Sequence, residues 1–238
     1  MPFALQASTA LRKLYNLVDN IRTLGPARAT SLYRYRLGEK LLDRRLGIRT
    51  TGLVGNAALE HSEHCHGYEA MHYGCLRTAM NYFAPDPNRD VMLDYGCGMG
   101  RAVVVAATFS FRRVIGVELS ESLCDVARNN LRQAVRHLSC RDVRILNADA
   151  TTYEVPPDVT AVFMFNPFAG PALQAVLERL AESLRRSPRA MRIVYVYPLH
   201  KTNEFARCPW LARDVTLPTF DWDDVAMIGY RAVLDALA

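Results

Sequence analysis

The chain has 238 residues, of which 50% are hydrophobic and 22% charged, and its formal net charge at pH 7 is +5. No apolar run approaches the roughly 18 residues of a membrane-spanning helix, and the six cysteines show no C-x-x-C spacing. These features argue against a membrane-spanning protein and a secreted disulfide scaffold, and they predict a cytoplasmic protein with reduced thiols. The length suffices for one large α/β domain with a modest extension.

The positive charge is concentrated at the start of the chain. Residues 1–50 hold ten Lys and Arg against three Asp and Glu, a net charge of +7, whereas the remainder has a net charge of −2. A solvated helical face explains this basicity. The alternative is a basic arm that binds nucleic acid, an acidic protein partner or an anionic membrane surface.

The first ninety residues read as helices and a connector. Apolar residues recur at helical spacing between residues 5 and 21, and a glycine-proline pair ends that pattern. A second helix is predicted at about 31–46. Residues 48–67 show little periodicity and indicate an irregular connector, and 68–83 indicates an amphipathic helix.

From residue 91 onward, strand and helix patterns alternate, which indicates parallel βαβ units. The last two strands flank an acidic turn at 221–224, which is typical of an antiparallel hairpin. The sequence therefore divides into a basic helical extension (1–50), a connector with a lid-like helix (51–90) and an α/β domain (91–238). In the α/β domain, strands are predicted at 91–95, 114–118, 143–146, 159–165, 192–197, 214–217 and 225–233, with helices at about 101–109, 121–136, 171–186 and 201–207.

The first predicted strand leads into a glycine-rich turn. It ends in Asp94, and Gly96, Gly98 and Gly100 follow at alternate positions before a helical pattern. This layout is typical of a nucleotide-binding βα unit, in which the backbone approaches a ligand closely. Dinucleotide sites favour G-x-G-x-x-G, whereas here the spacing is G-x-G-x-G after an acid. A carboxylate at this place repels a pyrophosphate but suits a ligand that carries ammonium and sulfonium groups.

This turn, with Cys97 between its glycines, resembles the first motif of class I S-adenosylmethionine-dependent methyltransferases, which have a seven-stranded Rossmann-like sheet. Glu118 ends the next strand, where an acid can accept hydrogen bonds from two ribose hydroxyls. The resemblance implies that Asp149 binds the adenine amino group, that the backbone at Ala150 meets the ring and that Leu119 lies against its face. Taken singly, Asp149 is equally well explained as a helix cap.

A second motif follows the fourth predicted strand. Asn166-Pro167-Phe168 resembles the D/N-P-P-Y/F motif of methyltransferases that modify amino groups. The Asn166 side-chain oxygen and the Pro167 carbonyl can accept the two hydrogens of an amine and so aim its lone pair, while Phe168 supplies an aromatic face. The shortened N-P-F form and the basic N-terminal region look more like non-SET protein-lysine methyltransferases than DNA-adenine enzymes. The alternative is a strand-ending turn in which Asn caps a helix.

The segment before the domain also carries a resemblance. Residues 67–73 are similar to a Y-E-x-T-P-Y stretch that lies upstream in bacterial members of this group and forms a lid over the methionine end of the cofactor. Here Met71 and His72 replace the Thr-Pro pair. The resemblance implies that Tyr68 and Tyr73 border the cofactor near its methyl group.

A cluster of potential metal ligands lies in and beside the connector. The alternatives are an ordinary polar connector, a metal site and, for its last member, a residue lining the active site. No second ligand pair occurs elsewhere, and methyl transfer to nitrogen needs no metal, so no metal site is predicted. The cluster consists of His61, Glu63, His64, Cys65, His66 and His72.

Together the motifs predict an S-adenosylmethionine-dependent N-methyltransferase that acts on an amine-bearing substrate, with protein lysine as the first candidate. A small-molecule N- or O-methyltransferase is the alternative. A dinucleotide-dependent oxidoreductase is disfavoured by the glycine spacing. A non-catalytic module that keeps the fold and binds nucleic acid or an anionic surface through the basic segment also remains open.

Overall fold

The computed structural model describes residues 18–19, 21–23, 25–51, 53–54, 68–198, 204–219 and 225–237. The chain divides into two compact units, Met1–Leu42 and Asp43–Ala238. The acidic turn at 221–224 and most of the histidine cluster, namely His61, Glu63, His64, Cys65 and His66, lie outside the described residues.

The boundary between the two units falls within helix α2 (Pro26–Leu46). This helix begins five residues earlier than predicted, because proline is favoured at the first helical position. It ends before Gly47, whose φ of +76° is the left-handed conformation that commonly stops a helix. Of the predicted helix at 5–21, only residues 18–19 and 21 are described, and they are helical.

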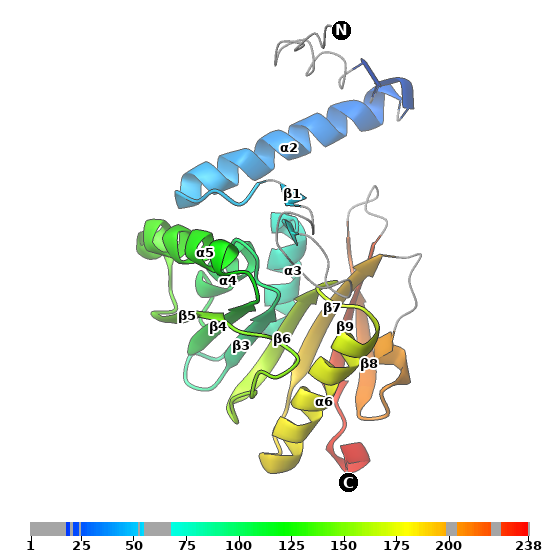
Figure 1. Cartoon of the computed structure of the whole chain (residues 1–238). Helices are drawn as coiled ribbons and strands as arrows, with labels where there is room; N and C mark the ends of the chain where they lie inside the picture. The colour runs from blue at the N-terminus through cyan, green and yellow to red at the C-terminus, as the bar shows by residue number, and fades with distance from the viewer. Residues whose placement is uncertain are drawn as a thin grey trace, which may run out of the picture. The chain divides into compact units, whose positions relative to one another are not determined.

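The larger unit is built on a seven-stranded sheet with the order β5-β4-β3-β6-β7-β9-β8 (Figure 1). The first five strands in this order are parallel, and β9 pairs antiparallel with both β7 and β8. The predicted seven-stranded fold with a final hairpin is therefore confirmed. The strands are β3 (Val91–Tyr95), β4 (Arg113–Glu118), β5 (Asp142–Asn147), β6 (Val159–Phe165), β7 (Arg192–Pro198), β8 (Leu211–Leu217) and β9 (Val225–Ala232).

The predicted helix at 68–83 is wrong in its first part. Strand β2 (Tyr68–Glu69) pairs antiparallel with β1 (Leu53–Val54), and helix α3 (Tyr73–Phe83) begins only after it. The pairing is with a segment about fifteen residues earlier in the chain, so helical periodicity alone could not reveal it.

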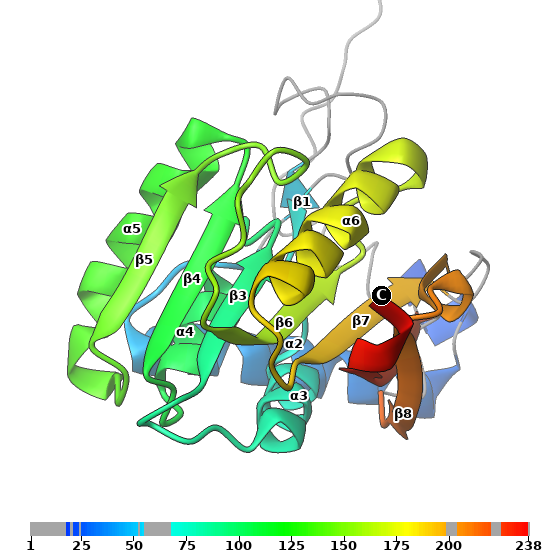
Figure 2. The same ribbon diagram turned by 90° about the horizontal axis from the view of Figure 1, so that it is seen from below.

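Helices cover both faces of the sheet (Figure 2). Helices α3, α4 (Arg101–Ala107) and α5 (Glu121–Ala134) pack on one face, and α6 (Gly170–Arg186) packs on the other. All five residues of the central strand β3 are buried, as expected for a parallel strand with both faces covered. Short 3₁₀ helices complete the unit: η2 (Val135–His137), η3 (Glu204–Arg207) and η4 (Leu234–Leu237).

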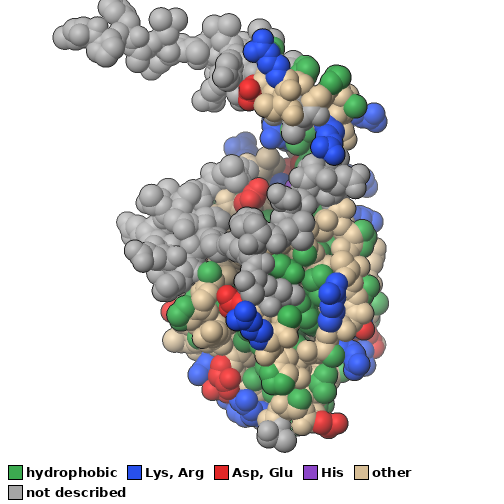
Figure 3. Space-filling view, turned by 90° about the vertical axis from the view of Figure 1, so that its right-hand side faces the viewer, with side chains coloured by type: hydrophobic (Ala, Val, Ile, Leu, Met, Phe, Trp, Pro, Cys, Tyr) green, Lys and Arg blue, Asp and Glu red, His purple; other side chains and the backbone are tan. Residues whose placement is uncertain are grey.

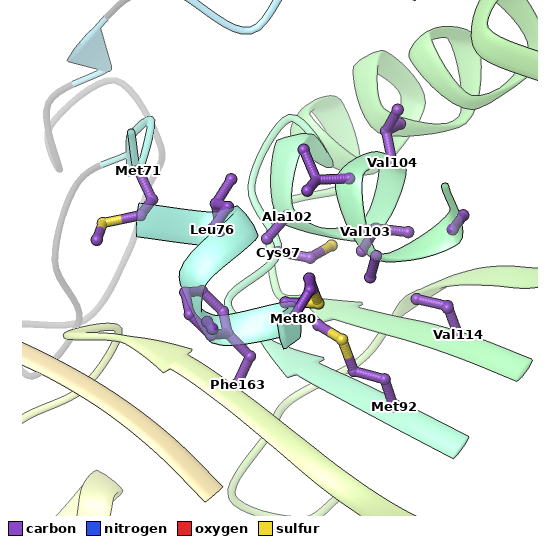
Figure 4. Close-up of a cluster of buried hydrophobic side chains, with 14 of the residues drawn as sticks. Met71, Leu76, Met80, Met92, Cys97, Ala102, Val103, Val104, Val114 and Phe163 are labelled. Carbon is purple, nitrogen blue, oxygen red and sulfur yellow. The ribbon is translucent and has the colours of Figure 1, made fainter. Parts of the chain in front are cut away.

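The core on the α3 and α4 side contains Met80, Met92 and Phe163, with Cys97 from the glycine turn among them (Figure 4). Gly116 of β4 makes this packing possible. A Cβ at Gly116 would lie 2.8 Å from both Cys97 Sγ and Val103 Cγ2. The glycine therefore lets the turn and the start of α4 lie directly on the sheet.

The surface of the larger unit is mixed in charge. On the face shown in Figure 3, acidic and basic side chains lie close to one another among hydrophobic and uncharged ones. Among the helices of the described part of the chain, none is long and apolar enough to cross a membrane.

We expect Gly116→Ala to lower the free energy of unfolding by about 1–3 kcal/mol, because the new methyl group overpacks the contact with Cys97 and Val103. Urea unfolding of the purified protein measures this. Gly38→Ala, in α2, is the matched control and should be neutral or stabilising, since alanine is the better helix former. Equal stability of Gly116→Ala and the unmodified protein would contradict the packing described.

Candidate functional site

The carboxyl ends of the parallel strands meet at one edge of the sheet, where open α/β sheets bind their ligands. The glycine turn after β3 lies there. Gly96 and Gly98 have φ values of +70° and +53°, a conformation that favours glycine. A Cβ at Gly96 would lie 2.6 Å from Pro167 Cβ, and one at Gly98 would lie 2.2 Å from Tyr68 Cδ2. The predicted residues Tyr68 and Pro167 thus flank the turn.

Glu118 ties the glycine turn to the end of β4. Its Oε2 accepts a hydrogen bond from the Gly98 amide at 2.9 Å, and its Oε1 accepts one from the Ser120 amide, also at 2.9 Å. Each carboxylate oxygen can accept more than one hydrogen bond. Glu118 therefore holds the turn in place and keeps acceptor capacity for the predicted ribose hydroxyls.

Cys97 occupies the turn but points away from its ligand-facing side. Its amide donates to Val117 O at 3.1 Å, and its side chain is buried among the core residues of α3 and α4 (Figure 4). Burial raises the pKa of the Cys97 thiol, and the nearby Asp94 adds to that effect. Only the backbone of Cys97 is therefore placed to meet a cofactor.

Asp94 differs from Glu118 in its surroundings. It is 2% exposed, and its Oδ2 has no hydrogen-bond partner among the described residues. Burial raises the pKa of Asp94 well above its ordinary value, and the neighbouring Glu118 carboxylate raises it further. A buried carboxylate without a partner is costly, and a cationic group at this position would offset that cost. The residues present therefore fit a ligand that carries positive charge.

The end of β5 supplies a different set of contacts. Asp149 Oδ1 accepts from the Thr151 amide at 2.8 Å and from the Thr151 hydroxyl at 2.7 Å, so the side chain closes a turn. No helix lies among the described residues between β5 and β6, so Asp149 is not the helix cap of the alternative interpretation. Leu119 is 44% exposed, and Ala150 is buried. Asn147, which the sequence analysis did not select, donates from Nδ2 to Leu119 O at 2.7 Å. It thereby fixes the segment that carries the predicted adenine contact.

The turn after β6 has an unusual backbone. Asn166 has a φ of +41°, although the residue before a proline normally adopts an extended conformation. Its amide donates to Val196 O at 2.8 Å, which anchors the turn to β7. Sparsely populated backbone conformations of this kind are concentrated at functional sites.

Phe168 does not provide the open aromatic face that the sequence analysis expected. It is 8% exposed and packs edge to face against Tyr95, with ring centroids 6.2 Å apart. The apolar side chain is buried because it continues the core beneath α6. Phe168 therefore anchors the Asn166-Pro167 turn to the hydrophobic core.

A buried polar network joins the segment before the domain to helix α4. Arg101, the first residue of α4, lies 3.3 Å from the Asp43 carboxylate, and both side chains are less than 10% exposed. Its Nε donates to Thr50 Oγ1 at 2.6 Å. Tyr73 donates to Asp43 Oδ1 at 2.6 Å, and its ring centroid is 4.5 Å from the Arg101 guanidinium carbon. Tyr73 therefore belongs to this network, and its expected contact with the cofactor stays a prediction.

Tyr68 and His72 precede Tyr73 in the chain, and both are partly buried. Tyr68 donates its hydroxyl to Thr50 O at 2.7 Å while its ring covers Gly98. Burial, together with the positive charge of Arg101, lowers the pKa of His72 to about 4. His72 is therefore neutral near pH 7, as a proton acceptor must be.

Asp43, Thr50 and Arg101 were missed by sequence reasoning. Residues 1–50 read as a basic surface extension, and no local pattern marks an aspartate within it as buried. Among the described residues, no group of His, Cys, Asp and Glu side chains is placed to hold a metal ion.

The comparisons with known proteins agree with this geometry. Residues 92–187 match the family model described as "Methyltransferase domain". This segment forms a methyltransferase domain. The "Ubiquinone biosynthesis O-methyltransferase" of Coxiella burnetii is 38% identical over 66 residues, which is 27% of this chain. The match spans only 28% of that relative's length.

Solved structures support the fold. The magnesium protoporphyrin IX methyltransferase from Synechocystis PCC 6803, solved with bound SAM, aligns with a TM-score of 0.53 and 13% identity, covering 68% of this chain and 80% of that chain. The methyltransferase domain of bacterial CtHen1-C aligns with a TM-score of 0.50 and 16% identity, covering 67% and 97%. At these identities the likeness concerns the fold alone. The predictions of a class I methyltransferase domain and of S-adenosylmethionine as the cofactor of such a domain are confirmed.

We expect cofactor binding to release a proton from Asp94. Its raised pKa favours the protonated form in the free protein, and the ammonium group of the cofactor favours the ionised form. Affinity for S-adenosylhomocysteine, which keeps that ammonium group, should therefore rise with pH until Asp94 is ionised in the free protein. Calorimetry in buffers of different ionisation enthalpy measures the released proton.

Asp94→Asn should remove this proton release and flatten the pH dependence. Asp142→Asn, a half-exposed carboxylate paired with Arg144, is the control and should behave like the unmodified protein. If Asp94→Asn and the unmodified protein release the same number of protons, the assignment of Asp94 is wrong.

Proposed function

We propose that this protein transfers a methyl group from S-adenosylmethionine to an amino group. The observation that carries the proposal is the contact between the two turns: Pro167 packs against Gly96, so the turn with the predicted acceptor motif adjoins the turn with the buried Asp94. Residues 91–238 would form the catalytic domain. The cofactor would be held by the backbone of Gly96, Cys97, Gly98 and Gly100, by the carboxylates of Asp94, Glu118 and Asp149, and by contacts from Leu119, Ala150 and Tyr68.

Methyl transfer to a neutral amine requires the protein mainly to orient the amine and to exclude water. When bound, the cofactor supplies an electrophilic methyl group on a sulfonium. The Asn166 side-chain oxygen and the Pro167 carbonyl accept the two hydrogens of a neutral amine, which directs its lone pair in line with the bond that breaks. The proton is lost after transfer, so no strong base has to act in the transition state. Positioning and exclusion of water supply most of the rate.

Protein lysine is the first candidate acceptor. The Asn-Pro turn supports an amino group, and the net charge of +7 in residues 1–50 supports an acidic protein partner, either as substrate or as an accessory surface. The described cysteines Cys75, Cys97, Cys124, Cys140 and Cys208 are free thiols, which supports a reducing, cytoplasmic setting.

A small-molecule oxygen acceptor is the second candidate. The 66-residue match to an O-methyltransferase supports it, since that relative's printed name specifies transfer to oxygen. The buried Phe168 also supports it, because the aromatic face expected for a cationic amine is absent from that position.

We expect Asn166→Ala to reduce turnover by about 10²-fold or more, because the amine would lose the oxygen that orients it. Affinity for S-adenosylhomocysteine should change less than threefold, roughly 0.7 kcal/mol. The measurements are transfer of a labelled methyl group to a cell lysate and calorimetry with S-adenosylhomocysteine. Asn129→Ala, an exposed position on α5, is the matched control.

The compound that carries the labelled methyl group after the reaction distinguishes a protein-lysine acceptor from a small-molecule oxygen acceptor. Label recovered as methylated lysine after acid hydrolysis of the protein fraction supports the first candidate, and label in a small-molecule ether supports the second. Equal losses of turnover and cofactor affinity in Asn166→Ala would contradict the role given to Asn166.

A further inference from the structure

A cavity of about 460 Å³ lies at the opposite edge of the sheet from the cofactor turn, at the amino-terminal ends of β3, β6 and β7. Strand β6 separates this cavity from Asn166. Its seven residues span roughly 20 Å at about 3.3 Å per residue. A ligand in the cavity would therefore be too distant to take part in methyl transfer.

The cavity carries an excess of positive charge. Four arginines line it, Arg89, Arg112, Arg189 and Arg192, against two aspartates, Asp90 and Asp158.

Both aspartates already have partners. Asp158 accepts hydrogen bonds from Arg112 and, at 2.6 Å, from Arg113 Nη2. Asp90 accepts from Arg89 Nε at 3.2 Å and from Thr160 Oγ1 at 2.9 Å. The two carboxylates therefore leave a net positive charge on the arginines around them.

Arg189 has a structural role in the cavity wall. Its guanidinium donates to Val159 O at 2.6 Å, to Ser187 O at 2.7 Å and to Ser183 Oγ at 2.8 Å. All of its hydrogen-bond partners among the described residues are neutral. Its charge therefore adds to the positive potential of the cavity without being offset by direct pairing.

Each of the other three arginines has guanidinium N–H groups that make no hydrogen bond to the described residues. Arg192 donates from Nη1 to Tyr82 O at 2.9 Å, and Arg89 uses only Nε. Arg112 uses Nε and Nη2. Within the described part of the chain, the remaining guanidinium N–H groups of these side chains have no acceptor, and all three side chains line the same cavity. Unused donors on three side chains that line one cavity suit an anion with several oxygens.

We propose that this cavity binds the phosphate group of a small phosphate monoester. Guanidinium groups match phosphate oxygens in geometry and charge, and arginine is the usual residue for this task. The volume falls in the range of about 300–1,000 Å³ that is typical of small-molecule sites. A bare phosphate ion would leave most of it unfilled, so the organic part of an ester belongs to the ligand.

Calorimetry with ribose 5-phosphate and with inorganic phosphate, at constant ionic strength set with chloride, tests the proposal on the full chain. We expect ribose 5-phosphate to bind with one-to-one stoichiometry and more tightly than inorganic phosphate. Arg192→Gln and Arg89→Gln should each weaken binding by about tenfold, the effect of losing one charge-assisted hydrogen bond of about 1.4 kcal/mol.

Arg89→Gln and the control Arg128→Gln show whether weaker binding reflects the cavity and not loss of the fold. Arg89 has a side chain that is 69% exposed, so its replacement leaves the core intact. Arg128→Gln removes the same charge from an exposed pair on α5 and should bind ribose 5-phosphate like the unmodified protein. Equal affinity of all variants, or binding of an RNA oligonucleotide without binding of either phosphate probe, would overturn the proposal. These readouts do not depend on methyl transfer and so stand apart from the proposed function.

Discussion

The arrangement of this protein depends on two carboxylates at the ends of adjacent parallel strands. Asp94 lies opposite Gly116 in the β3–β4 register, and Glu118 follows two residues later on the same edge. Glu118 is stabilised by two backbone amides, whereas Asp94 is buried with an oxygen that lacks a partner among the described residues. Burial of the Asp94 carboxylate therefore destabilises the free protein, and a positively charged ligand can offset that cost. The packing of the glycine turn thus favours a cofactor that carries positive charge.

A second constraint fixes the chain that precedes the domain. The buried Arg101–Asp43 pair joins the first residue of α4 to the end of α2, and Thr50 and Tyr73 complete its hydrogen bonds. A buried ion pair costs desolvation that its attraction only partly recovers, so its main contribution is to specify one position for the segment. That position places Tyr68 over Gly98.

The two edges of the sheet differ in charge. Carboxylates dominate the carboxyl edge, where Asp94 and Glu118 lie, and arginines dominate the amino edge around Asp158. The same strands therefore separate a site suited to a cation from a site suited to an anion, with the apolar core between them. This separation lets two ligands of opposite charge bind without direct competition.

Within residues 91–238, the sequence by itself determined the order of the strands and the main helices along the chain, the glycine turn and the two strand-end acids, because these follow from local periodicity and from residues adjacent in the chain. It could not determine contacts between distant segments. The pairing of β2 with β1, the burial of Phe168 against Tyr95, the network of Asp43, Tyr73 and Arg101, and the arginine cavity all join residues far apart in sequence. Only the tertiary structure decided them, since burial and charge pairing depend on which surfaces the folded chain brings together.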